Sequence, residues 1–141
     1  MRKLVLAGLL AGVTLAAGAC GGPTVHDGTQ HGDLPTFTEN LVGDVVACDG
    51  SEEAGHWYMI SQVNVLNGRG DDYVSVTAYM RYTTADGSKT RTEAQTGNLH
   101  KTGYTHDAVK SGDTIPYAFN FDASGVHYTK CQFLGAVGNA K

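Results

Sequence analysis

The sequence predicts an all-β protein, a single antiparallel β-sandwich of six to seven strands preceded by a signal peptide and a flexible tether. Three observations lead to this prediction. Apolar and polar residues alternate in several short runs after residue 41. Clusters of Gly, Asp, Asn and Ser separate these runs. The chain has 141 residues, 19 of them glycine and only 17% charged, which is enough for one domain.

Residues 1–19 have the pattern of a signal peptide. The chain starts with the basic segment Met1-Arg2-Lys3, and an apolar run follows from Leu4 to Leu15. That run is well short of the roughly 20 residues that a helix needs to cross a bilayer. Small residues then lead directly to Cys20. This order of basic start, apolar run and small residues is typical of export.

The segment Ala17-Gly18-Ala19-Cys20 resembles the lipobox of bacterial lipoproteins, although those proteins usually carry Leu three residues before the cysteine. The resemblance implies diacylglycerol on the Cys20 sulfur, cleavage after Ala19, and often a further acyl chain such as palmitate on the new amine. Two or more acyl chains anchor a protein stably, whereas one binds only marginally. The alternative is an ordinary cleaved signal peptide with an incidental cysteine.

The chain has three cysteines, an odd number for an exported protein. If Cys20 is acylated, Cys48 and Cys131 remain, and an oxidising compartment would pair them. We therefore expect a disulfide between Cys48 and Cys131. The alternative is two free, buried thiols.

Residues 20–40 are predicted to be the lipidated cysteine and a flexible tether, because Gly, Asp, His, Thr and Gln fill this segment without periodicity. Residues 41–138 are predicted to form the sandwich. No segment after residue 40 has a helical period.

Alternation of apolar and polar residues predicts five strands, and a further strand is predicted at residues 92–98. The residues that share one parity are Val42, Val46 and Cys48; Trp57, Met59, Val63 and Val65; Val74, Val76, Ala78, Met80 and Tyr82; Ile115, Tyr117, Phe119 and Phe121; and Thr129, Cys131 and Phe133. Turn residues occupy 67–71, 85–88, 110–113 and 123–125, and Asp86-Gly87 is a hairpin signal.

The run from Asp44 to Val137 resembles the FxLYD-type domain of bacterial exported proteins, in its actinobacterial form. The matching segments are Val45–Asp49, Gln62–Gly68, Tyr73–Tyr79 with Asp86-Gly87, and Ser111–Thr114 with Tyr128–Cys131. The resemblance implies an immunoglobulin-like sandwich and carries over no catalytic residue. Two features depart from that pattern: Ser111-Gly112 replaces the usual Pro-Gly, and the segment from Gln95 to Asp107 is long.

Several classes of function are not expected. The formal charge is −4 and the basic residues are scattered, whereas nucleic-acid binding needs clustered Lys and Arg. No G-x-S-x-G elbow, P-loop or G-x-G-x-x-G is present. We therefore predict no enzymatic activity, no cofactor and no nucleic-acid partner.

The six histidines are interpreted as solvated loop residues, with weak metal binding as the alternative. They are His26, His31, His56, His100, His106 and His127. Tyr73 and Tyr79 share the outward parity of their strand with Arg81, which makes these three a candidate contact surface. The alternative is cross-strand packing on a solvated face.

The sequence therefore predicts a lipoprotein anchored on the extracytoplasmic face of the cell membrane, where it acts as a surface interaction or accessory module. Its partner is expected to be an unidentified protein or envelope component. One alternative is a solute- or metal-binding lipoprotein, which a pocket lined by His100, His106 and His127 would favour. The other is a phage-encoded lipoprotein that blocks superinfection.

Overall fold

The computed structural model of the chain describes residues 25–29, 33–98 and 108–140, with side chains from residue 33 onward except that of Asn98. The predicted signal peptide and Cys20 lie outside the described residues, as do residues 21–24 and 30–32 of the predicted tether; residues 25–29 of that segment form a strand.

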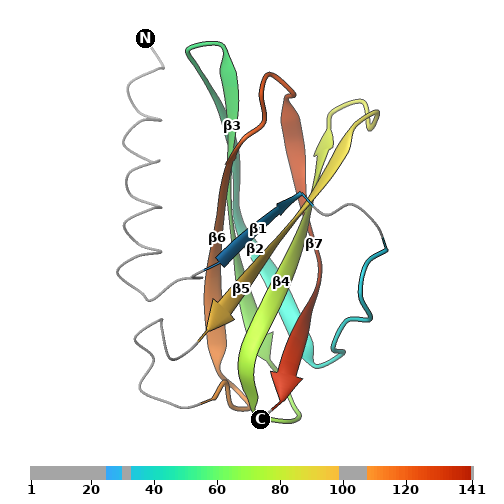
Figure 1. Cartoon of the computed structure of the whole chain (residues 1–141), viewed down its shortest axis with the longest axis vertical. Coiled ribbons are helices and arrows are strands. Elements are labelled where there is room, and N and C mark those ends of the chain that lie inside the picture. The colour runs from blue at the N-terminus through green and yellow to red at the C-terminus, as the bar shows by residue number, and fades with distance from the viewer. Residues whose placement is uncertain (1–24, 30–32, 99–107, 141) are drawn as a thin grey trace.

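Seven strands lie in these residues, and they form two antiparallel sheets (Figure 1). The four-stranded sheet has the order β1-β5-β4-β7 and the three-stranded sheet the order β2-β3-β6. The described part of the chain contains no helix. The all-β sandwich is thus confirmed. The strands are β1 Val25–Thr29, β2 Leu41–Glu53, β3 His56–Asn67, β4 Tyr73–Thr84, β5 Thr90–Asn98, β6 Thr114–Asp122 and β7 Tyr128–Ala140.

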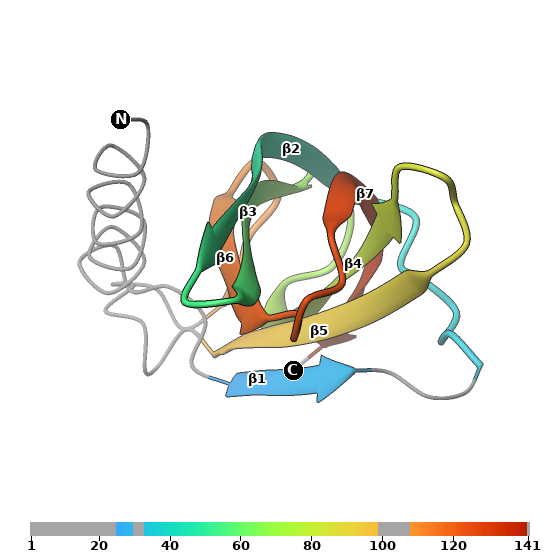
Figure 2. The same cartoon turned by 90° about the horizontal axis from the view of Figure 1, so that it is seen from above.

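Figure 2 shows the two sheets end-on, facing each other. One apolar core fills the space between them. The inward faces of β3, β4 and β6 supply most of it, in the alternation that the sequence predicts. The members of the core with only 0–1% exposure are Met59, Val63, Val65, Val76, Ala78, Met80, Tyr82, Val109, Tyr117, Phe119 and Ala136.

The strand β2 departs from the sequence prediction. Val42 and Val46 are 58% and 49% exposed, whereas Leu41 is buried and Val45 packs against the core. A β-bulge between Val45 and Ala47 adds a residue to β2, and Cys48 therefore faces inward after Val46 has faced outward. The expectation that Val42, Val46 and Cys48 share one face is wrong, because the bulge shifts the parity.

The disulfide Cys48–Cys131 is present and joins the two sheets. Cys48 lies on β2, at one edge of the three-stranded sheet, and Cys131 lies on β7, at one edge of the four-stranded sheet. Their Cα atoms are 5.8 Å apart and 83 positions apart in sequence. The bridge therefore holds the sheets together where no backbone ladder connects them.

The β4–β5 hairpin turns on Asp86 and Gly87, as predicted. Gly87 has φ 76°, a conformation that suits glycine. The Asp86 carboxylate accepts hydrogen bonds from the Thr84 hydroxyl at 2.6 Å and from the Ser88 N–H at 3.0 Å. These hydrogen bonds lower the pKa of Asp86 from 3.8 to about 2, and the bond from Thr84 has the largest effect.

This low pKa predicts acid sensitivity that the variant Asp86→Asn would reduce. The unfolded state binds the proton near pH 3.8 and the folded state only near pH 2, so stability is lost as the pH falls through this window. We expect the thermal midpoint of Asp86→Asn to fall less steeply than that of the parent protein between these two values. Parallel slopes in melts followed by circular dichroism would contradict the prediction.

Asn67, at the end of β3, is fully buried and organises the opposite end of the sandwich. Its amide donates to the carbonyls of Val109 at 3.1 Å and Asp71 at 3.2 Å, and accepts from Asn40 at 2.6 Å. Every polar atom of this side chain is thereby satisfied without water. Asn67 thus holds together the segments around Asn40, Asp71 and Val109 at this end of the sandwich.

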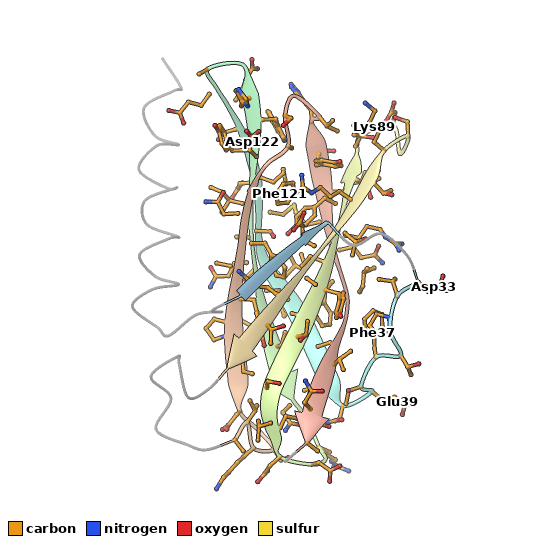
Figure 3. All side chains as sticks on the ribbon, viewed as in Figure 1. Asp33, Phe37, Glu39, Lys89, Phe121 and Asp122 are labelled. Atoms are coloured by element: carbon orange, nitrogen blue, oxygen red, sulfur yellow. A yellow bond between two sulfur atoms is a disulfide. The ribbon has the colours of Figure 1, made fainter. Side chains whose placement is uncertain are left out.

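Residues 33–40 differ from the expectation of a flexible tether, because part of this segment is fastened to β7. The Thr38 N–H donates to the Ala136 carbonyl at 2.8 Å, and the Gly138 N–H donates to the Thr38 hydroxyl at 3.0 Å. The Phe37 ring lies over Gly135, where an added Cβ would approach it to 2.3 Å, and Figure 3 shows it beside β7. Composition gave no sign of this contact, since it depends on an open sheet edge and a glycine far along the chain.

Candidate functional site

The predicted contact surface of Tyr73, Tyr79 and Arg81 is not one exposed patch. Tyr73 is 5% exposed and belongs to the core, and its hydroxyl donates to Asn40 Oδ1 at 2.8 Å. The pairing of β4 with β7 shifts register between Tyr73 and Ser75, which turns Tyr73 inward. The assignment of Tyr73 to the outer surface is therefore wrong.

Tyr79 and Arg81 do lie on the outward face of β4, where both are partly exposed. The Phe37 ring packs on Tyr79 with a centroid separation of 5.6 Å and a tilted geometry. The outer face of the four-stranded sheet is thus partly covered by the chain's own segment 33–40. A partner at this face would meet Phe37 as well as Tyr79 and Arg81.

A row of polar residues on β5 faces the interior, which sequence alternation did not reveal. Cross-strand register places Arg91, Glu93 and Gln95 opposite the inward-facing residues Tyr82, Met80 and Ala78. β5 reads Thr-Arg-Thr-Glu-Ala-Gln-Thr from Thr90, so both of its faces are largely polar and no apolar stripe marks the inner one. Sheet pairing, rather than apolar patterning, decides which side is buried here.

Glu93 is the most unusual member of this row, because it is a carboxylate with 0% exposure. It pairs with Nε of Arg91, whose guanidinium also lies 4.1 Å from the centroid of the Phe121 ring. Gln95 is 8% exposed, and its Oε1 has no hydrogen-bond partner in the described residues. The buried Glu93 carboxylate needs the Arg91 guanidinium as its partner, since desolvation of an unpaired charge would cost several kcal/mol.

Tyr82 completes the buried polar group, and its hydroxyl lies 2.7 Å from Ser61 Oγ. Burial raises the pKa of Tyr82 far above its ordinary value, and the Ser61 hydrogen bond opposes that shift only in part. The phenol therefore stays protonated over the physiological pH range and acts as a hydrogen-bonding group that joins β3 to β4.

The end of the sandwich at the β2–β3 hairpin carries two histidines. The His127 ring stacks on Trp57 with centroids 4.3 Å apart, and the Trp57 Nε1–H donates to the Tyr128 carbonyl at 3.2 Å. His56 Nδ1 lies 2.8 Å from the Asp122 carboxylate. The backbone N–H of Ser124 is the main cause of the lowered pKa of Asp122. Figure 3 shows Asp122 and Phe121 at this end of β6.

No group of three or more metal-ligand side chains occurs in residues 33–97 and 108–140. His56 and His127 have separate partners, and the side chains of His26, His31, His100 and His106 lie outside those described. The prediction of a pocket lined by His100, His106 and His127 falls partly on residues that are not described. In the described ranges, no helix is both long and apolar enough to span a bilayer.

Comparisons with known proteins add no relative. No protein-family model matches the chain, no curated protein matches it, and no solved structure matches it.

Proposed function

We propose that the chain is a lipoprotein anchored through Cys20 to the extracytoplasmic face of the cell membrane. The observation that supports it most is the pairing of Cys48 with Cys131, which leaves Cys20 as the odd cysteine of three. A structural disulfide suits an oxidising, extracytoplasmic compartment. Cys20 directly follows the apolar leader and its small residues, where a lipid-modified cysteine would stand.

The sandwich itself serves in this proposal as an interaction or accessory module for a protein or envelope partner. Large side chains such as Tyr82, Tyr117 and Phe119 fill the space between the sheets. The outer sheet faces and the turns are thus the surfaces on which a partner would act. Crosslinking from intact cells, with the captured component identified by mass spectrometry, tests this part of the proposal.

The variant Cys20→Ala tests the anchor. We expect it to move from the membrane fraction to the soluble extracytoplasmic fraction, because no acyl chain would hold it. The double variant Cys48→Ala, Cys131→Ala is the matched control and is expected to stay in the membrane fraction. Retention of Cys20→Ala in the membrane fraction would refute the lipid anchor.

A further inference from the structure

β1 fixes the chain close to the proposed anchor. Residues Val25–Thr29 pair with β5, with Val25 opposite Thr96 and Thr29 opposite Glu93. Cys20 is separated from Val25 by five Cα–Cα steps, which span about 17 Å when fully extended. A free segment from Cys20 to Leu41 could reach about 70 Å. Pairing of β1 with β5 thus replaces a long tether by a short link.

β1 also determines which side of the sandwich lies near the anchor. It forms one edge of the four-stranded sheet and pairs only with β5 (Figure 2). The short link from Cys20 to β1 would hold the sandwich close to the membrane. The side of the sandwich that carries β1 and β5 would then face that membrane. Residues 33–40 are fastened near β7, at the opposite edge of the same sheet.

The three-stranded sheet is more acidic than the four-stranded sheet, which also favours an orientation with the four-stranded sheet toward the membrane. The strands β2, β3 and β6 carry five acidic residues, Asp44, Asp49, Glu52, Glu53 and Asp122, and no Lys or Arg. The strands β1, β4, β5 and β7 carry three basic residues, Arg81, Arg91 and Lys130, and two acidic ones, Asp27 and Glu93. An anionic bilayer would therefore repel the three-stranded sheet more strongly.

The outward residues of the four-stranded sheet suit a headgroup region. Thr77 and Thr96 are hydrogen-bonded across β4 and β5 at 2.8 Å, and Asn139 donates to Ser75 at 2.9 Å. Tyr79 lies beside Arg81 on this face, and aromatic and basic side chains both favour the interface of a bilayer. Two acidic residues of segment 33–40, Asp33 and Glu39, lie on the β7 side rather than beside β1 (Figure 3).

We propose that the sandwich rests against an anionic bilayer on the outer face of its four-stranded sheet, at the side that carries β1, with the three-stranded sheet turned away. This inference rests on the proposed lipid anchor at Cys20. Its basis is the short link from Cys20 to β1 together with the charge difference between the sheets.

Side-chain oxidation by hydroxyl radicals tests the orientation. The full-length acylated protein is bound to vesicles of phosphatidylcholine and phosphatidylglycerol, and oxidation is read by mass spectrometry. We expect Tyr79 to lose reactivity relative to the soluble Cys20→Ala protein. Val42 and Leu66, on the outer face of the three-stranded sheet, are expected to keep theirs.

The double variant His26→Pro, Gly28→Pro tests the role of β1. Proline has no N–H and disrupts strand pairing, so the link would lengthen to about 44 Å between Cys20 and Asp33. We expect Tyr79 on vesicles to regain the reactivity of the soluble protein. The matched control is Gly32→Pro, which lies beyond β1 and is expected to leave the protection in place.

Four results would overturn the inference. They are protection of Val42 and Leu66 instead of Tyr79, equal reactivity of both faces in bound acylated protein, unchanged protection in the β1 variant, and protection of Tyr79 that appears in soluble Cys20→Ala protein as its concentration rises. The last result would indicate a second copy of the chain at this face. All four leave the lipid anchor standing, whereas bound protein without an acyl group would overturn the anchor and the orientation together.

Discussion

Removal of the disulfide by Cys48→Ala with Cys131→Ala is expected to lower the free energy of unfolding by about 4 kcal/mol. The bridge spans 83 positions, and a closed loop of this size greatly restricts the unfolded chain. It also ties together two edge strands that have no backbone hydrogen bonds to each other. Since small domains have only about 5–15 kcal/mol of stability, this loss is a large part of the total.

Urea titration measures this loss, with the fluorescence of Trp57 as the reporter because Trp57 is the single tryptophan. Cys20→Ala is the control, since it removes a cysteine that takes no part in the bridge. We expect its unfolding midpoint to match that of the parent protein when both are compared in the same detergent. A double variant as stable as the parent would show that the bridge does not hold the sheets together.

The second large effect is expected for Arg91→Ala, which should lower the free energy of unfolding by about 3 kcal/mol. The substitution leaves the Glu93 carboxylate, which has 0% exposure, without the guanidinium that pairs with it. Breaking a buried pair by removing one partner typically costs about 3–5 kcal/mol. Arg91 is 23% exposed, which places the expected loss at the lower end.

Arg81→Ala is the matched control for Arg91→Ala, since it removes an arginine from the outer face of the same sheet. We expect it to change stability by less than about 0.5 kcal/mol. The double variant Arg91→Ala, Glu93→Leu is expected to recover much of the loss, because it removes the buried charge as well. Equal effects of Arg91→Ala and Arg81→Ala in urea titrations would contradict the structural role of the buried pair.

Sequence alternation was sufficient for the strands that are buried on one face. Met59 and Val63 on β3, Val76 and Met80 on β4, and Phe119 on β6 alternate with more exposed residues, and the core contains them as predicted. The turns at Asp86-Gly87 and Ser124-Gly125 were recognisable for a similar reason, since short polar and glycine residues suit tight backbone conformations.

Alternation did not predict which side chains are buried where a bulge shifts the register, or where burial depends on a neighbouring strand or on a residue distant in sequence. The bulge in β2 reverses the parity after Val45, and the shift near Tyr73 buries a side chain that strict alternation places outside. Glu93 alternates with Arg91 and Gln95 on a face of β5 that carries no apolar stripe, and its position opposite Met80 explains its burial. The packing of Phe37 depends on Gly135, almost one hundred residues away, and no local pattern predicts such a contact.

The candidate contact surface was likewise predictable only in part. Tyr79 and Arg81 face outward as predicted, but the covering of Tyr79 by Phe37 was not predictable from the strand that carries it. The unequal charges of the two sheets could be read only once strand pairing had assigned each strand to a sheet.

The proposed location and orientation of the protein both depend on a membrane anchor at Cys20. Intact mass spectrometry of the protein extracted from the membrane fraction tests it most directly. We predict a chain that begins at Cys20, bears the mass of a diacylglycerol group with or without a further acyl chain, and is lighter by two hydrogens because Cys48 and Cys131 are joined. A chain that retains residues 1–19 or carries no lipid would show that Cys20 is not the anchor.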